Sequence, residues 1–173
     1  DTRRTGVPNK PVTFEAKLPP SLFGGATQLG VSIWVRFTGR GNDNGMLFGS
    51  SWDYGNHTNC FNLNFSSAEL FSFRLALRGQ IYARLCPPSR PSPGVWHHWW
   101  FPYEGGRLAA YLNGVLDLSM PCTGLPLFTP AADYAIQLRG NGVAESVDFG
   151  EIAVWRDALP SLAGMTAYRK SGT

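Results

Sequence analysis

Two short turns lie close together in the segment GVWHHWWFPYEGGRLAAYLNGVLDL, residues 94–118, and they constrain the fold more than any other feature. Gly105-Gly106 and Asn113-Gly114 are pairs that favour two-residue hairpin turns, because both central positions of such a turn take positive φ. With Gly105-Gly106 as a turn, the residues on either side pair in a consistent register. Glu104 faces Arg107, Tyr103 faces Leu108, Phe101 faces Ala110, Trp99 faces Leu112, Trp100 faces Tyr111 and His98 faces Asn113. The segment therefore predicts three antiparallel strands.

The same register predicts to which face of the sheet each histidine and tryptophan side chain points. Neighbouring residues of a strand point to opposite faces, so His97 and His98 cannot bind one metal ion together. Trp99 and Phe101 share the face that meets apolar partners across the turn. We therefore expect Trp99 and Phe101 in the core, and structural or surface roles for the two histidines.

Other segments show the same period of two. Residues 29–37 place Leu29, Val31, Ile33, Val35 and Phe37 on one face. Residues 71–77 and 81–85 predict a hairpin around Arg78-Gly79-Gln80, in which Leu77 faces Ile81, Leu75 faces Ala83 and Phe73 faces Leu85. Further strands are expected in 46–51, 134–140 and 147–155, and only residues 159–170 have helical spacing.

Composition agrees with an all-β fold. The chain has 173 residues, 43% of them hydrophobic, with 20 Gly and 13 Pro that fall between short apolar runs. No apolar run approaches the roughly 18 residues of a membrane span, and a net charge of +3 from scattered basic residues does not suit nucleic acid. We expect an N-terminal extension at residues 1–11, and one antiparallel two-sheet sandwich at residues 12–170 with a short C-terminal helix.

Four motifs, in order along the chain, resemble those of laminin-G-like domains, which have a concanavalin A-like jelly-roll fold. The motifs are VSIWVRF, MLFGSS, GVWHHWWFPYEGGRLAAYLNGVL and FGEIAVWRDALPSLAG, and the last of them also resembles the closing strand of pentraxins. The resemblance implies binding of glycans or proteins, often with calcium. It implies a non-catalytic extracellular recognition module of a larger surface or matrix protein. The alternative is a domain that assembles protein chains without a small ligand.

A smaller set of relatives hydrolyses or cleaves glycans, and the carboxylates test this third possibility. Glu145, Asp148 and Glu151 are three residues apart, so neighbours in this set should face opposite sides of one strand. Glu145 and Glu151 would share a face but lie about 20 Å apart, whereas glycosidase carboxylates lie roughly 5–10 Å apart. We therefore expect no enzyme.

Candidate calcium ligands lie in two loops. Asn42 and Asp43 occur in GRGNDNGM, and Asp53 occurs in SSWDYGNHTN. Hard cations need several oxygen ligands, but Asn, Asp and Gly are also ordinary turn residues. The connection before the closing strand holds only Glu145, so the resemblance implies at most one calcium ion, with Asp43 or Asp53 as a ligand.

Candidate ligand-binding residues lie on a strand face and in a loop. In the second hairpin Arg74 faces Arg84, with Tyr82 beside them, and like charges across a sheet are unfavourable. The pair suggests an acidic ligand or a carboxylate from elsewhere, although arginine stems covering aromatic rings would look the same. Trp52 and Tyr54 are exposed aromatic candidates, or they cover the edge of the core.

Two sequons and three cysteines point to an extracellular protein. Asn56 and Asn64 begin the sequons Asn-His-Thr and Asn-Phe-Ser. Counting strand reversals places Cys60 and Cys122 at one end of the sandwich and Cys86 at the other, about 17–20 Å away. Disulfide geometry requires Cα atoms within about 7 Å, so we expect Cys60–Cys122, with Cys86 free or linked to another chain.

Overall fold

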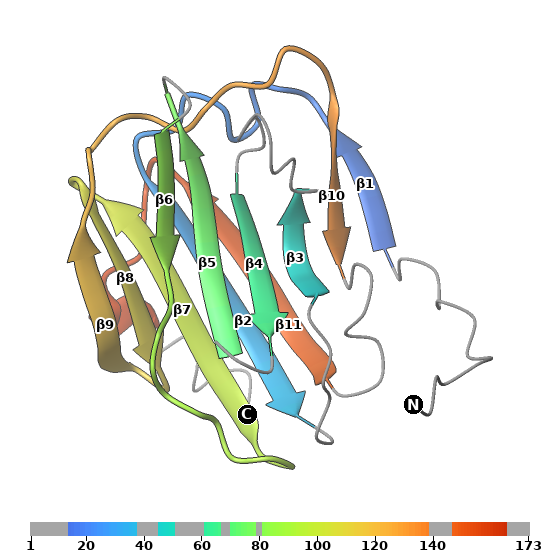
Figure 1. Ribbon diagram of the computed structural model, residues 1–173, viewed down its shortest axis with the longest axis vertical. Helices are drawn as coiled ribbons and strands as arrows, with labels where there is room; N and C mark the ends of the chain where they lie inside the picture. Colours follow the sequence, from blue (N-terminus) through green and yellow to red (C-terminus); the bar gives the residue numbers. More distant parts are fainter. Residues whose placement is uncertain are drawn as a thin grey trace, which may run out of the picture.

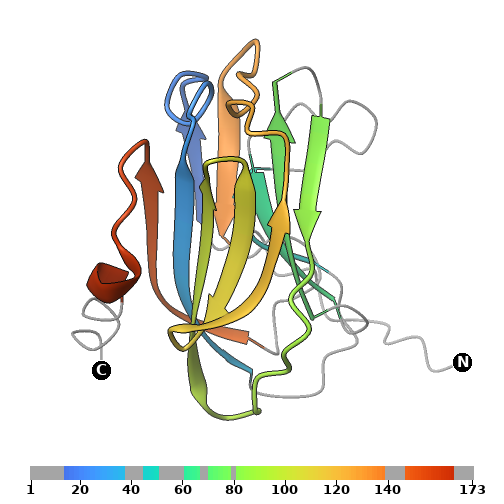
Figure 2. The same cartoon turned by 90° about the vertical axis from the view of Figure 1, so that its left-hand side faces the viewer.

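The computed structural model describes residues 14–37, 45–50, 61–66, 70–78, 81–138 and 147–165. They form two antiparallel sheets packed face to face, the jelly-roll sandwich that we expected (Figures 1 and 2). In spatial order, the six-stranded sheet contains β1 (Phe14–Leu18), β10 (Tyr134–Leu138), β3 (Gly45–Ser50), β4 (Phe61–Ser66), β5 (Leu70–Leu77) and β6 (Ile81–Leu85). The five-stranded sheet contains β11 (Val147–Arg156), β2 (Leu29–Phe37), β7 (Trp96–Glu104), β8 (Arg107–Leu112) and β9 (Val115–Pro121).

The core lies between the sheets and follows the predicted alternation. The five apolar residues of β2 that share a face are all buried: Leu29, Val31, Ile33, Val35 and Phe37. Phe71 and Phe73 of β5 pack from the other sheet against Trp99 and Phe101 of β7, with ring centroids 4.8–6.1 Å apart. Trp99 and Phe101 stack on each other with centroids 5.6 Å apart. Their predicted burial is confirmed, since both are 0% exposed.

Both predicted turns and their registers are confirmed. Glu104 pairs with Arg107 across Gly105-Gly106, whose φ angles are 56° and 73°. Asn113 and Gly114 also have positive φ, 51° and 83°, as the tight hairpin turn requires. The β5–β6 hairpin has the predicted pairs as well, Leu77 with Ile81, Leu75 with Ala83 and Phe73 with Leu85.

His97 and His98 take up structural roles on opposite faces of β7. The ring Nε2 of His97 lies 3.2 Å from the carbonyl oxygen of Ser92, and its Nδ1 lies 3.2 Å from Nδ2 of Asn113. On the other face, Nε2 of His98 lies 2.7 Å from Oγ of Ser32. Each ring therefore has its own protein partners, and the two rings do not converge on one ion.

The closing strand corrects our expectation about its carboxylates. β11 pairs with β2 through Phe149↔Val35 and Ile152↔Ile33, so three steps along β11 match two along β2. This bulge adds one residue and reverses the alternation. Asp148 lies opposite Arg36 on the outer face, and Glu151, which precedes the core residue Ile152, lies on the outer face too. The expectation that Asp148 and Glu151 face opposite sides was therefore wrong.

The segments that follow β6 and β11 pack against the sandwich. The proline-rich segment 87–93 runs beside β9, where the backbone N–H and the hydroxyl of Ser89 donate to the carboxylate of Asp117. The expected C-terminal helix is a single turn at residues 162–165, beside the five-stranded sheet (Figure 2), with Met165 buried. No helix within the described ranges has the length and apolar character needed to cross a membrane.

Candidate ligand-binding face

A row of residues crosses the outer face of the six-stranded sheet, one from each strand. The register joins Glu15, Gln137, Gly49, Asn62, Arg74 and Arg84 as successive partners from β1 to β6. We call these six residues the polar row. Apart from Glu15, each has at least one core residue as a chain neighbour, so alternation places these residues on the side of the sheet away from the core. Glu15 joins the row as the direct partner of Gln137.

Arg74 and Arg84 form the charged end of the polar row. Their Nε atoms lie 3.1 and 3.0 Å from the same acceptor, Oγ of Ser72, so the two Nε atoms are no more than about 6 Å apart. Two unit charges at this separation repel by about 3 kcal/mol at an effective dielectric constant near 20, and by less than about 1 kcal/mol in water. The charged end of the polar row therefore brings two guanidinium groups together on one face of the sheet.

Two asparagines continue this face on β4. In one orientation of its amide, Asn64 donates from Nδ2 to Oδ1 of Asn62 at 2.8 Å. In the swapped orientation, the Asn64 oxygen instead accepts from Nε and Nη1 of Arg74 at 3.3 and 3.2 Å. Asn62 is 0% exposed, and its Nδ2 is buried without a hydrogen-bond partner. A buried N–H group without an acceptor is uncommon, because each such group lowers the free energy of unfolding by about 1–3 kcal/mol.

Toward its opposite end, the polar row has no side chain at β3, where Gly49 is buried, and is acidic at β1. A Cβ at Gly49 would lie 2.5 Å from Cα of Asn62 and 2.6 Å from the carbonyl oxygen of Phe61, and φ at Gly49 is 131°. Only glycine fits there, so no side chain separates Asn62 from Gln137. Nε2 of Gln137 donates to Oε2 of Glu15 at 2.8 Å. This hydrogen bond holds the Glu15 carboxylate at the β1 edge of the sheet, opposite the edge that carries Arg84.

The structure brings together part of the predicted ligand site. Arg74 and Arg84 pair directly, as expected, and Tyr82 of β6 lies opposite Ala76. The remaining predicted ligand-binding and metal residues lie outside the described residues: Trp52, Tyr54, Asn42, Asp43 and Asp53. In the described ranges, no three His, Cys, Asp or Glu side chains are grouped so that they could hold a metal ion.

Some of the predicted glycosylation and disulfide residues lie within the described ranges, and others lie outside them. Asn64 is half-buried in β4 with the amide contacts above, whereas Asn56 and Cys60 lie outside the described residues. Cys86 and Cys122 have free thiols and directly follow β6 and β9, which run in opposite directions (Figure 1). Because Cys122 is free, the structure does not contain the expected bridge to Cys60, and this pairing stays a prediction.

Sequence reasoning missed the members of the row that come from distant strands. The members that were not singled out are Glu15, Gln137, Gly49 and Asn62, and Ser72, which accepts from both arginines, was missed as well. Asn62 and Asn64 alternate with the apolar residues of β4, just as Ser72 and Arg74 do in β5. That alternation shows that they leave the core. It does not show that β10, β3 and β4 are neighbours, so only the local Arg74–Arg84 pair could be found.

A pocket at one end of the sandwich has different chemistry. It is lined by Thr27, Gln28, Gly105, Gly106, Cys122, Thr123 and Gly124. Burial raises the pKa of the Cys122 thiol, so this group is uncharged near neutral pH. The lining contains no charged side chain, which makes the polar row the stronger candidate for a binding site.

Comparison with protein families agrees with this architecture. A laminin-G-type family model, described as the concanavalin A-like lectin/glucanases superfamily, matches residues 13–161. The chain belongs to this superfamily. The resemblance inferred from the four motifs is therefore confirmed for this lectin-like domain. A sequence comparison with curated proteins finds no match.

Solved structures share the fold of this lectin-like domain at low sequence identity. The binding domain of botulinum neurotoxin serotype D has a TM-score of 0.68 and 14% identity, covering 91% of this chain and 39% of that chain. The binding domain of Paraclostridial Mosquitocidal Protein 1 has a TM-score of 0.66 and 14% identity, covering 86% and 38%. Botulinum neurotoxin type C has a TM-score of 0.64 and 12% identity, covering 84% and 36%. The lectin-like domain thus spans less than half the length of each of these chains.

Proposed function

We propose that this lectin-like domain is a non-catalytic recognition module that binds acidic glycans through the polar row. In this proposal the domain is extracellular and belongs to a larger surface or matrix protein. The observation that carries the proposal is the convergence of Arg74 and Arg84 on Ser72. An anion that lies between or above the two guanidinium groups would accept hydrogen bonds from both of them.

The hydrogen-bonding groups of the face suit the same class of ligand. Guanidinium groups carry donors only, and their fork geometry matches carboxylate and sulfate oxygens. The half-buried amide of Asn64 lies next to Arg74, whereas the Asn62 amide is fully buried and supports the face from beneath. A glycan with a carboxylate or sulfate would place its charge at Arg74 and Arg84 and its hydroxyl groups toward the Asn64 amide.

Two structural neighbours support a glycan as the ligand. Botulinum neurotoxin type C enters cells in a manner dependent upon interaction with two ganglioside molecules. The binding domain of botulinum neurotoxin DC has been solved in complex with SialylT, at a TM-score of 0.64 and 12% identity. These neighbours are binding domains of the same fold, and this likeness favours recognition over catalysis for the present chain.

A glycan array with sialylated, sulfated and neutral members tests the proposal, with calcium and with a chelator. We expect acidic glycans to bind, and the double variant Arg74→Ala/Arg84→Ala to lose at least about tenfold in affinity, since each charge-assisted contact contributes about 1.5–3 kcal/mol. Arg90→Ala/Arg107→Ala removes the same net charge from exposed positions elsewhere and serves as the matched control. Binding should also weaken with salt.

Two results would contradict the proposal. Equal losses in both double variants would mean that net charge alone attracts the glycan. No glycan binding together with concentration-dependent self-association would favour the alternative of a domain that assembles protein chains. Melting temperatures of both variants control for folding.

A further inference from the structure

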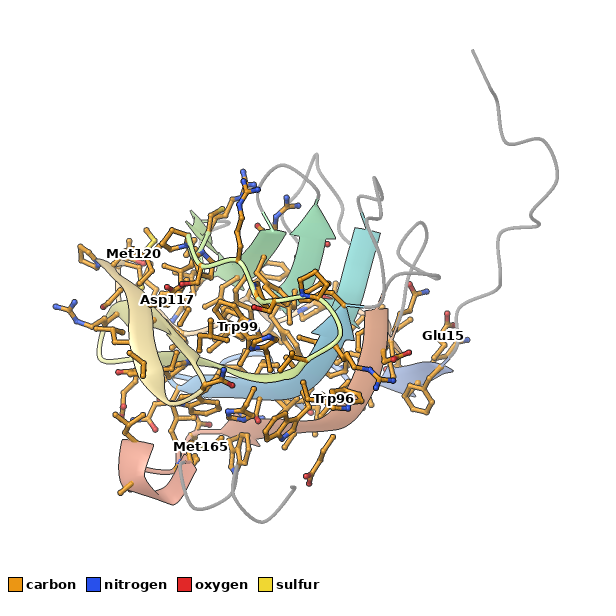
Figure 3. The ribbon with its side chains drawn as sticks, turned by 90° about the horizontal axis from the view of Figure 1, so that it is seen from below. Glu15, Trp96, Trp99, Asp117, Met120 and Met165 are labelled. Carbon is orange, nitrogen blue, oxygen red and sulfur yellow. The ribbon has the colours of Figure 1, made fainter. Side chains whose placement is uncertain are left out.

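We infer that the other sheet carries a second, independent site, which binds neutral carbohydrate. The site is a row of three residues on the outer face of the five-stranded sheet, Asp148 of β11, Arg36 of β2 and Trp96 of β7. They are successive cross-strand partners. We call these three residues the tryptophan platform. Figure 3 shows Trp96 on the outer side of its sheet, beside β11, whereas Trp99 lies between the two sheets.

The platform is held in a fixed geometry. Nε and Nη2 of Arg36 both donate to Oδ2 of Asp148, at 2.9 and 2.6 Å. Cζ of Arg36 lies 5.1 Å from the centroid of the Trp96 ring, a cation–π contact. An arginine held by an ion pair and by a ring loses little further freedom when a ligand binds, so the platform is preorganised.

The platform also keeps polar groups for a ligand. Since both bonds of the ion pair use Oδ2, the other carboxylate oxygen, Oδ1 of Asp148, makes no hydrogen bond with the described part of the chain, and neither does Nη1 of Arg36. The Asp148 and Arg36 side chains are 42% and 41% exposed, and Trp96 is 39% exposed. The surface therefore presents one acceptor, one donor group and part of an indole ring side by side.

Gly150, in the bulge of β11, lies beside the platform. A Cβ at this position would lie 2.8 Å from Cβ of Trp34, which is a clash, and 3.5 Å from Cζ3 of Trp96, which is an ordinary van der Waals contact. Glycine therefore lets β11 pack closely against Trp34, next to the Trp96 ring.

The chemistry of the platform fits an uncharged sugar. A pyranose has one face of C–H groups that packs on an aromatic ring, and hydroxyl groups that both donate and accept hydrogen bonds. The carboxylate accepts from one hydroxyl and the guanidinium donates to its neighbour. Because Arg36 and Asp148 neutralise each other, the platform has no net charge with which to attract an acidic ligand, in contrast to Arg74 and Arg84.

Titration of the whole chain with maltotetraose, cellotetraose and lacto-N-tetraose tests this inference by NMR. We expect at least one of these neutral oligosaccharides to shift the indole N–H resonance of Trp96, assigned from its loss in Trp96→Phe. Trp96→Ala should weaken that binding by at least about tenfold, as truncation of a central aromatic contact does. Asp148→Ala should weaken it as well, whereas Leu116→Ala, which truncates an exposed residue of the same sheet, should leave it unchanged.

The outcomes separate the tryptophan platform from the polar row. Arg74→Ala/Arg84→Ala should lose acidic glycans and keep the neutral oligosaccharide, and Trp96→Ala should do the reverse. The inference is overturned if no neutral oligosaccharide shifts the Trp96 resonance at 10 mM, a concentration of about the Kd of a weak sugar site. It is also overturned if Trp96→Ala binds the neutral ligand as well as the unchanged chain does. The resonance shift is measured in the unchanged chain, so it does not depend on whether a variant folds.

Discussion

Trp96, Trp99 and Trp100 lie on one strand, yet they occupy three different environments. Trp99 is in the core, stacked on Phe101. Trp100 lies on the outer face, where Gly30 leaves room for its ring: a Cβ at residue 30 would be 1.9 Å from Cη2. Trp96 is partly exposed under Arg36. The same side chain therefore supplies core volume, cover for a sheet and a contact surface, according to its place in the register.

Replacement of Trp99 tests this division at the level of one residue. Trp99→Ala should lower the free energy of unfolding by about 3–5 kcal/mol, because it removes a buried aromatic ring and leaves a cavity. Chemical denaturation measures this loss. Trp96→Ala is the matched control and should cost much less, because its ring is already partly exposed. A loss below about 1 kcal/mol for Trp99→Ala would contradict the assigned register.

At the level of strands, local pairing could be predicted and distant pairing could not. The turns at Gly105-Gly106 and Asn113-Gly114 fix which residues face each other, so the β7–β8 register follows from short-range chemistry. The bulge in β11 has a weaker signal, since the isolated Gly150 in DFGEI fits either a bulge or a close approach of another residue to the backbone. Nothing local brings Gln137 beside Gly49. For this reason the charged end of the polar row was predicted and the rest was not.

The segment after β9 closes one end of the sandwich and depends on a buried phenol. The hydroxyl of Tyr103 donates to the carbonyl oxygen of Leu125, and the N–H of Cys122 donates to Gly106 at 2.7 Å. Burial, with the Cys122 thiolate as a smaller contribution, raises the pKa of Tyr103 to about 12. Folding therefore favours the neutral phenol.

This raised pKa predicts a pH dependence with a definite sign. The unfolded-state pKa of tyrosine is about 10, so the contribution of Tyr103 to stability is complete below pH 10 and is lost as the pH rises toward 12. Absorbance at 295 nm should show one phenol titrating near pH 12, and Tyr103→Phe should remove that step. Titration of every tyrosine near pH 10 in the folded protein would contradict the burial of this hydroxyl.

At the level of the whole molecule, the two outer faces have opposite characters. The six-stranded sheet presents amides and two arginines, and the five-stranded sheet presents aromatic rings with a neutralised ion pair. Since the sheets lie back to back, a ligand on one face does not block the other (Figure 2). Occupancy of both faces would join two separate glycan chains through one domain.

We also propose that the domain binds calcium, with the loop residue Asp43 or Asp53 as a ligand. A ligand that binds only the folded state stabilises it, by about 2.7 kcal/mol at one hundred times its Kd. We expect millimolar calcium to raise the melting temperature, and Asp43→Ala or Asp53→Ala to abolish that rise. Asp133→Ala, at an exposed position before β10, is the control. No shift in the unchanged protein would remove the proposed metal.

The polar row takes one residue from each of six strands, and this has a consequence for when the site comes into existence. The hairpin with Arg74 and Arg84 can form from neighbouring chain, but β10 carries Gln137 and pairs with strands from the first third of the sequence. Pairings between such distant segments form slowly, because the chain between them must first be ordered. During synthesis, the complete row therefore arises only after β10 has left the ribosome and joined the sheet. Glycan binding at the row would then report the maturity of the domain, and a chain truncated before β10 would carry both arginines without the surface that they belong to.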